Sequence, residues 1–174
     1  MQLLTKIRKT CNKMDPNGRL YNIVAKEGLD LTNPLAVREF IVEFEKVMAE
    51  HPDAIFGNQF PLEHTFTDGI YCRQITIPAG FLLTGRIHKH EHPNFLLKGR
   101  VSYLTEHTGV QIIEGPLFMV SKPGTKRLLY THTEVVWTTI HHNPDNETDI
   151  DKLEDFLAAT NYNDYENFLQ LEVA

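Results

Sequence analysis

The sequence predicts a mainly β domain, a sandwich or barrel, with α-helices added at both ends. Between about residues 69 and 143, short runs of β-branched and aromatic residues alternate with tight-turn signals, which is typical of antiparallel all-β domains. Outside this stretch, apolar residues recur at helical spacings of three and four. A chain of 174 residues suits one domain. We expect a single domain over 1–174, with an N-terminal helical or extended part (1–68), a barrel (69–143) and C-terminal helices (144–174).

The clearest N-terminal helix is expected over residues 33–51. Thr32 or Asn33 can cap its first amides, Pro34 is tolerated at the first helical position, and His51-Pro52 supplies a stop. Its apolar residues fall on one face, which favours packing against a core: Val37, Phe40, Ile41, Phe44, Val47 and Met48.

Seven strands are expected in the β region, separated by turn residues such as Pro78-Ala79-Gly80 and Gly115-Pro116. The expected strands are Tyr71–Ile77, Leu82–His90, Asn94–Leu97, Arg100–Glu106, Val110–Ile113, Leu117–Val120 and Leu128–Ile140. The last can also be two strands broken near His132. Such regular spacing of turns predicts a sandwich or a barrel.

After Asn143-Pro144 the chain becomes acidic and helical again. Thr148 can cap a helix that carries Ile150 and Leu153, and Asn163 can cap a second helix with Tyr165. We expect both helices to lie on the outside of the barrel.

Charge and cysteine content exclude several classes of protein. The net charge of -6 argues against a nucleic-acid partner, because the densest basic stretch, Lys6 to Lys9, is short. Cys11 and Cys72 lie far apart and lack metal-type spacing, which fits two free buried thiols in a reducing cytoplasm. No apolar run suits a signal peptide or a membrane span, so we expect a cytoplasmic protein that binds no membrane.

Three histidines spaced by two residues carry the functional prediction: His88, His90 and His92. Alternation on a strand sends all three to one face, and imidazole is a common ligand of transition metals. Residues i and i+2 lie about 6.6 Å apart on a strand and can share an ion, whereas i and i+4 lie about 13 Å apart. His92 therefore joins the site only if the chain bends, and Pro93 makes a bend at 91–93 reasonable.

The arrangement of these residues resembles two sequence motifs of the cupin superfamily. A strand with His-x-His, a turn and a short apolar strand ending at Gly99 resembles the first motif. Gly115, a spacer and the run Lys122-Pro-Gly-Thr-Lys-Arg127 resemble the second. The resemblance covers about residues 69–143 and implies a cupin-type double-stranded β-helix, the RmlC-like jelly-roll barrel, with a metal ion in its mouth.

The wording is closest to uncharacterised cupin-like proteins of tailed bacteriophages and bacteria. They resemble the stretch from His88 to Leu97, the later Pro-Gly-Thr-Lys-Arg and Val-Trp-Thr-Thr. A phage-encoded protein would act in the host cytoplasm.

Two departures from the cupin pattern bear on the chemistry. Where the family has a metal-binding glutamate, counting from Gly99 gives His92 and counting from His90 gives Asn94. Where the second motif has a histidine, this chain has Arg127. A guanidinium accepts no hydrogen bond and cannot coordinate a metal ion, and its positive charge repels a nearby cation.

Two hypotheses remain open beside the alternative that the histidines only fill the barrel mouth. In the first, His88, His90 and His92 bind a divalent transition metal (Zn, Ni, Fe, Mn or Cu), with His132, His141 or water completing the site of a metal-dependent small-molecule enzyme. In the second, the protein is a non-catalytic accessory protein of a phage that binds a host protein or, through Arg127 and the histidines, a small anion.

Neither hypothesis names a catalytic residue or a reaction. A homodimer is also expected, since open sheet edges need covering. The candidate ligand-binding residues are Asn94, Arg127, His132, Trp137 and His141.

Overall fold

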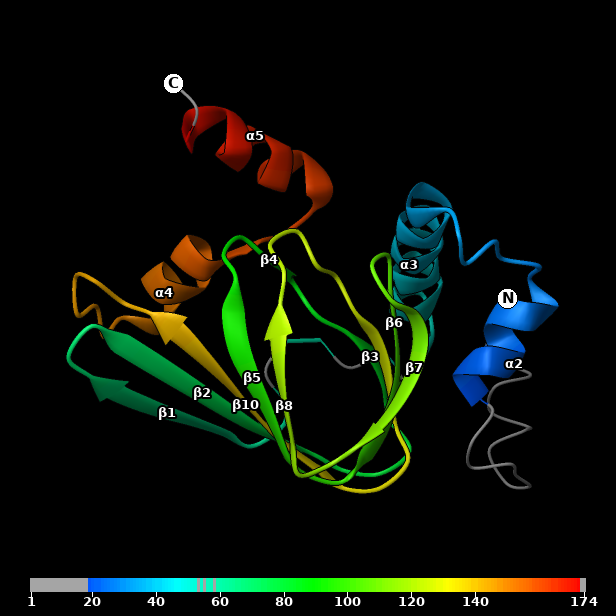
Figure 1. The fold of residues 1–174 in the computed structure, drawn as a ribbon, viewed down its shortest axis with the longest axis horizontal. Helices are drawn as coiled ribbons and strands as arrows, with labels where there is room; N and C mark the ends of the chain where they lie inside the picture. Colours follow the sequence, from blue (N-terminus) through cyan, green and yellow to red (C-terminus); the bar gives the residue numbers. More distant parts are fainter. Residues whose placement is uncertain (1–18, 53, 55, 58, 173–174) are drawn as a thin grey trace.

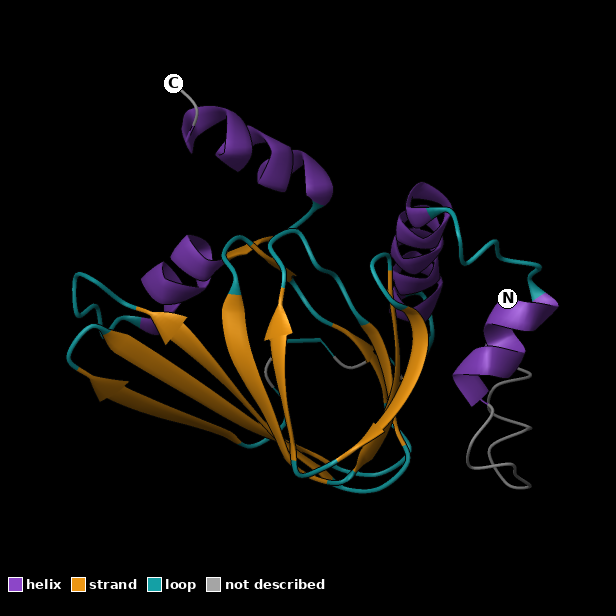
Figure 2. Ribbon diagram, in the orientation of Figure 1, coloured by secondary structure: helices purple, strands orange, loops and turns teal. Residues whose placement is uncertain are grey.

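The computed structural model describes residues 19–52, 54, 56, 57 and 59–172, which form two large antiparallel sheets and one small one, with helices at the periphery (Figures 1 and 2). The first sheet contains, in spatial order, β1 (Leu62–Thr67), β2 (Ile70–Ile77), β10 (Val135–His142), β5 (His92–Lys98) and β8 (Leu117–Ser121). The second contains β3 (Leu82–Thr84), β9 (Leu128–Thr131), β6 (Arg100–Thr105) and β7 (Gly109–Glu114). A small third sheet pairs β4 (Ile87–His88) with β11 (Ala158–Ala159).

The order of the strands is that of a jelly roll. The eight strands β2, β3 and β5–β10 fall into the orders β2-β10-β5-β8 in one sheet and β3-β9-β6-β7 in the other. In both sheets an early strand pairs with a late one, so the chain winds as a double-stranded β-helix. The predicted mainly β jelly-roll class, with helices at both ends, is confirmed.

The strand predictions differ from the structure in two places. Strand β1 pairs with β2 through a tight connection at Asp68-Gly69, and we did not predict β1, although Asp-Gly is a strong hairpin signal. The predicted strand Leu82–His90 is interrupted at Gly85-Arg86 and becomes β3 and β4. The alternative of a break near His132 is confirmed, because β9 ends at Thr131 and β10 begins at Val135.

The N-terminal helices cover the outer face of the four-stranded sheet (Figure 1). Helix α3 (Pro34–Ala49) is capped by Asn33, whose side chain accepts hydrogen bonds from two backbone amides of the first turn. Its buried residues pack with those of α2 (Arg19–Lys26) and of the sheet, which confirms that the apolar stripe serves packing. The residues of this core are Leu20, Val24, Val37, Ile41, Phe44, Leu104, Val110 and Leu128.

A second core fills the space between the two sheets. Leu96 of β5, Val101 of β6 and Val135 of β10 are fully buried there. Trp137 and Tyr103 belong to the same core, so these aromatic residues serve packing as well as bordering the site described below.

The two C-terminal helices lie outside the barrel, as predicted, near β4 (Figure 1). Helix α4 (Ile150–Leu157) packs against Tyr71, and α5 (Tyr162–Glu172) packs against Ile87. Both predicted caps are wrong. Asp149 caps α4 in place of Thr148.

At the second helix, Asn161 accepts a hydrogen bond from the amide of Asp164, and Asn163 lies inside α5. The cap must be the residue just before the first helical turn, and the chain begins each helix one or two residues away from the expected position.

Some sequence predictions fall outside the described residues, namely the basic stretch Lys6 to Lys9 and Cys11. Cys72 is described and is a free, half-buried thiol. Within the described part of the chain, no helix is long and apolar enough to cross a membrane.

Candidate metal centre and adjoining pocket

Three histidine side chains from three strands converge near the start of β5 and the end of β10. His88 lies on β4, His92 begins β5 and His141 lies on β10, and one ring nitrogen from each lies within 4.8 Å of the other two. The ring centroids of His88 and His92 are 4.1 Å apart, and those of His92 and His141 are 4.6 Å apart. Metal–nitrogen bonds of about 2.0–2.1 Å place neighbouring ligand atoms roughly 3 Å apart, so small ring rotations bring the three nitrogens around one ion.

A bend in the chain brings His88 and His92 together. The strand is interrupted at Lys89-His90, two residues before the position we expected, and the strict alternation of side chains is lost there. The bend brings His88 and His92 close together although they are four residues apart, and it turns His90 away from them.

The Pro-Gly turn of the second motif fixes β4 in this place. The amide of Gly124 donates a hydrogen bond to the carbonyl oxygen of His88 at 2.8 Å. Gly124 has a φ of +76°, and a Cβ there would lie 2.9 Å from the ring of Tyr165 on α5. Only glycine therefore fits between this turn and the C-terminal helix.

Burial keeps the three imidazoles neutral. It lowers the pKa of His92 to about 4 and that of His141 to about 3, and it holds the pKa of His88 well below 6.5. Neighbouring histidines and arginines lower the pKa of His88 and His141 further. Neutral imidazole is the form that binds metal ions.

Two nitrogens of the cluster make no hydrogen bond to any described residue. These are Nδ1 of His88 and Nε2 of His92, and both are buried. Buried polar atoms are nearly always satisfied, so two such atoms in one cluster point to a bound group. Three neutral nitrogen donors fit a borderline transition metal.

The structure places His90, one of the predicted ligands, outside this cluster. Its ring lies 5.0 Å from that of Phe156 on α4 and 5.4 Å from that of Phe168 on α5. His141, predicted as a ligand-binding residue and as one of the candidates to complete the metal site, lies with His88 and His92.

Arg127 is a buried cation beside the cluster. Its guanidinium lies 5.7 Å from the ring centre of Trp137 and 5.9 Å from that of Tyr103. It donates a hydrogen bond to Oγ of Ser121, and its buried Nε has no partner among the described residues. No carboxylate of the described chain forms an ion pair with it, and burial lowers its pKa. The site therefore holds one uncompensated positive charge.

The guanidinium and the histidine cluster border the same pocket. The pocket has a volume of about 110 Å³, and both His88 and Arg127 line it. Its apolar wall consists of Leu83, Leu129 and Trp137. Arg86 also lines it, but this side chain is half-exposed and pairs with Glu154 at 3.1 Å.

Asn94, a predicted ligand-binding residue, forms hydrogen bonds with two side chains beside this pocket. Its side-chain oxygen accepts a hydrogen bond from Nε1 of Trp137 at 3.2 Å, and its amide donates to Oγ of Ser121. Sequence reasoning missed Ser121. Alternation along β8 could have found it, because Met119 and Ser121 alternate with the exposed Phe118 and Val120.

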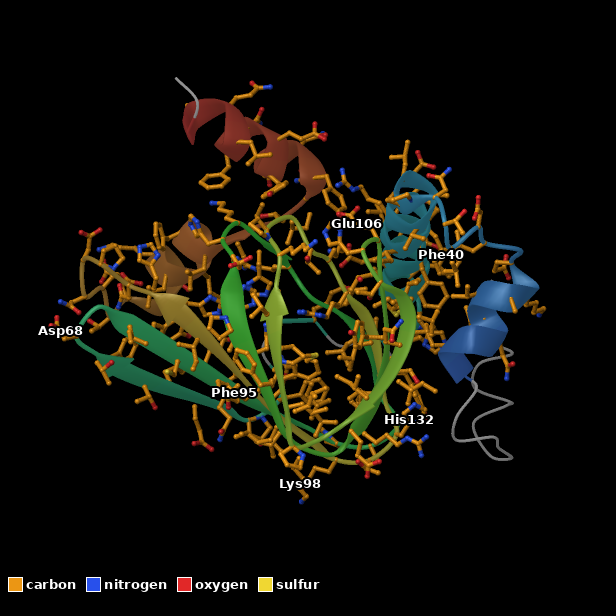
Figure 3. The ribbon with its side chains drawn as sticks, in the orientation of Figure 1. Phe40, Asp68, Phe95, Lys98, Glu106 and His132 are labelled. Carbon is orange, nitrogen blue, oxygen red and sulfur yellow. The ribbon has the colours of Figure 1, made fainter. Side chains whose placement is uncertain are left out.

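The remaining predicted residue, His132, lies away from the cluster. Its Nε2 forms a hydrogen bond with Oγ of Ser102 at 2.5 Å, and its ring packs edge-on against Tyr130. Figure 3 shows it toward the end of the barrel where Lys98 lies.

Comparison with known proteins finds similarity among solved structures only. No family model and no curated protein sequence matches the chain. Ectoine synthase from P. lautus is similar with a TM-score of 0.47 and 11% identity, over 63% of this chain and 83% of that one.

Two further structures are similar over about half of this chain. An RmlC-like cupin with a double-stranded β-helix fold from Methanocaldococcus jannaschii has a TM-score of 0.41 and 11% identity, over 53% of this chain and 84% of its own. The Cnp3 cupin domain from Schizosaccharomyces pombe has a TM-score of 0.42 and 11% identity, covering 53% and 71%. These similarities transfer no activity, ligand or partner to the present chain.

Proposed function

We propose that this protein binds a divalent transition metal through His88, His92 and His141 and a small molecule in the adjoining pocket, as a metal-dependent enzyme. The observation that carries the proposal is the convergence of one ring nitrogen from each of three histidines within 4.8 Å of one another. Packing alone does not require three polar rings from three strands to meet with unsatisfied nitrogens. A neutral, all-nitrogen site favours zinc, nickel or copper over magnesium or calcium.

The residues around the cluster prepare it for this role. Burial holds the imidazoles in the form that binds metal, and the carbonyl of His90 orients the ring of His92. When bound, such a metal supplies a Lewis acid that polarises a substrate oxygen or activates water. Arg127 and Trp137 then hold and orient the small molecule at the pocket wall.

Metal analysis of purified protein tests the proposal. Protein prepared without chelator is expected to contain about one transition metal ion per chain, and His88→Ala and His141→Ala variants are expected to lose it. His90→Ala is the matched control and should keep the metal, because its ring lies between α4 and α5 rather than in the cluster. A metal that survives His141→Ala but is lost in His90→Ala would overturn this ligand set.

Arg127 favours a second candidate, a non-catalytic module that binds a small anion without metal. Its guanidinium lacks a carboxylate partner in the described chain and would repel a cation at the histidines. An accessory protein of a phage, acting in the host cytoplasm, would suit this function. Recovery of folded, metal-free protein with a co-purifying anion would favour it over the enzyme.

A further inference from the structure

We propose that the pocket binds a short-chain monocarboxylate, with its carboxylate on Arg127 and its hydrocarbon chain against the apolar wall. The inference deepens the proposed function by naming the class of its small molecule, and it rests on the pocket of that function. It does not require the metal.

The charge of the pocket calls for one negative group. Arg127 donates to a neutral oxygen, Oγ of Ser121, and that same oxygen also receives the amide of Asn94. Ser121 and Asn94 are neutral and do not offset the positive charge of Arg127, and no described carboxylate forms an ion pair with it. A buried cation without a counter-ion is costly, so a monoanion bound beside it has a large electrostatic gain.

The unsatisfied donor has the geometry that a carboxylate prefers. Nε of Arg127 is buried and unpaired among the described residues. Nε–H together with a second guanidinium N–H forms a planar fork that matches the two oxygens of a carboxylate. The ligand can therefore bind side-on through two hydrogen bonds to Arg127.

Apart from His88, the other polar side chains on the pocket wall are already engaged. The hydroxyl of Thr125 donates to the carbonyl oxygen of Lys122 at 2.7 Å, and Arg86 pairs with Glu154 at 3.1 Å. A phosphate or sulfate presents oxygens in every direction, several of which would face hydrocarbon here without a donor. A carboxylate presents its oxygens on one side only and leaves the rest of the molecule apolar.

The shape of the pocket sets the size of the ligand. Leu83, Leu129 and Trp137 form the apolar wall of a space of about 110 Å³. An engineered protein cavity of about 150 Å³ binds benzene, so this space takes a molecule of roughly four to six heavy atoms. Propionate and butyrate have that size. Because His88 lines the same pocket, the carboxylate also offsets the charge of a cation bound at the histidines.

Calorimetric titration of the full-length, metal-free protein tests this class of ligand. Butyrate is expected to bind, whereas butyramide, which has the same shape without the charge, should not. Inorganic phosphate should bind more weakly than butyrate. In Arg127→Gln, butyrate affinity should fall at least about tenfold, because the fork and the charge are both lost.

Two further variants sharpen the result. Arg127→Lys keeps the charge but lacks the planar fork, so it should recover only part of the affinity. Arg86→Gln is the matched control, since Arg86 borders the same pocket but is half-exposed and paired, and it should bind butyrate like the parent protein. Circular dichroism before each titration verifies that the variants are folded.

The outcomes separate this inference from the metal proposal. His141→Ala should lose metal but keep butyrate. The carboxylate assignment would be overturned if butyrate bound neither the metal-free nor the zinc-loaded protein. It would also be overturned if phosphate bound more tightly than butyrate, or if Arg86→Gln and Arg127→Gln lost equal butyrate affinity. Butyrate binding that depends on Arg127 in a protein that binds no metal would overturn the metal centre alone.

Discussion

Nδ1 of His92 donates a hydrogen bond to the backbone carbonyl oxygen of His90 at 3.1 Å. A carbonyl only accepts, so the proton of the neutral ring lies on Nδ1 and the lone pair lies on Nε2, the atom without a partner in the described chain. His90 thus contributes to the cluster through its main chain while its own ring packs near Phe156.

Burial of these imidazoles predicts a loss of stability in acid for the metal-free protein, because it lowers the pKa values of His92 and His141. The unfolded histidines titrate near pH 6.5, but the folded pKa values are about 4 for His92 and about 3 for His141. Between these values the unfolded state binds more protons, so the stability contributed by the neutral rings is complete above pH 6.5 and is lost as the pH falls toward 3. By pH 4, the protonation of each ring in the unfolded state lowers the free energy of unfolding by up to about 3 kcal/mol.

Urea denaturation at pH 7.0, 5.5 and 4.5 measures this effect. Carboxylates also affect stability in this range, so the control is the double variant His92→Gln/His141→Gln, whose stability should depend less steeply on pH. Equal slopes for the two proteins would contradict the prediction.

Arg127 and its neighbour Lys126 are expected to respond to substitution in opposite directions. Arg127→Met removes a buried charge without a counter-ion and should stabilise the ligand-free protein by about 1–3 kcal/mol. Lys126 is only 3% exposed, but its ammonium contacts the carboxylate of Glu45 and the carbonyl of Gly85, both at 3.0 Å. Lys126→Met should therefore destabilise by about 1–3 kcal/mol. Guanidinium chloride denaturation of both variants shows whether the signs differ.

Trp137, the only tryptophan of the chain, should report on the pocket by its fluorescence. Butyrate titrated into the parent protein is expected to change the emission intensity, and Arg127→Gln should suppress the change. Asn94→Leu removes the partner of the indole N–H and should cost about 1–3 kcal/mol of stability. If calorimetry showed saturable binding of butyrate while the emission of Trp137 stayed unchanged, the ligand would bind elsewhere.

The homodimer expected from the sequence stays a prediction, and strand β8 is the edge on which we place it. Phe118 and Val120 are 55% and 52% exposed there, and β8 pairs on one side only, with β5. Pairing between two such edges would cover both side chains and backbone groups. Light scattering should give twice the chain mass, and Phe118→Asp should give the monomer. A monomeric parent protein at high concentration would disprove it.

Local patterns in the sequence predicted more of the fold than of the candidate site. Turn residues and alternation were enough to predict most strands, because these signals are local. The bend at Lys89-His90 interrupts the alternation, so His90 does not lie on the face that it was expected to share with His88 and His92. His141 reaches the cluster only because β10 lies between β2 and β5, a pairing that no local pattern specifies.

Strand β10 is the last of the barrel in sequence but lies in the middle of the five-stranded sheet. The ribosome must therefore release the chain beyond His142 before β10 can pair with β2 and β5. Until then, His141 cannot join His88 and His92. A metal ion held by all three histidines could therefore bind only after β10 has paired with β2 and β5. A nascent chain halted before Val135 would leave the facing edges of β2 and β5 unpaired.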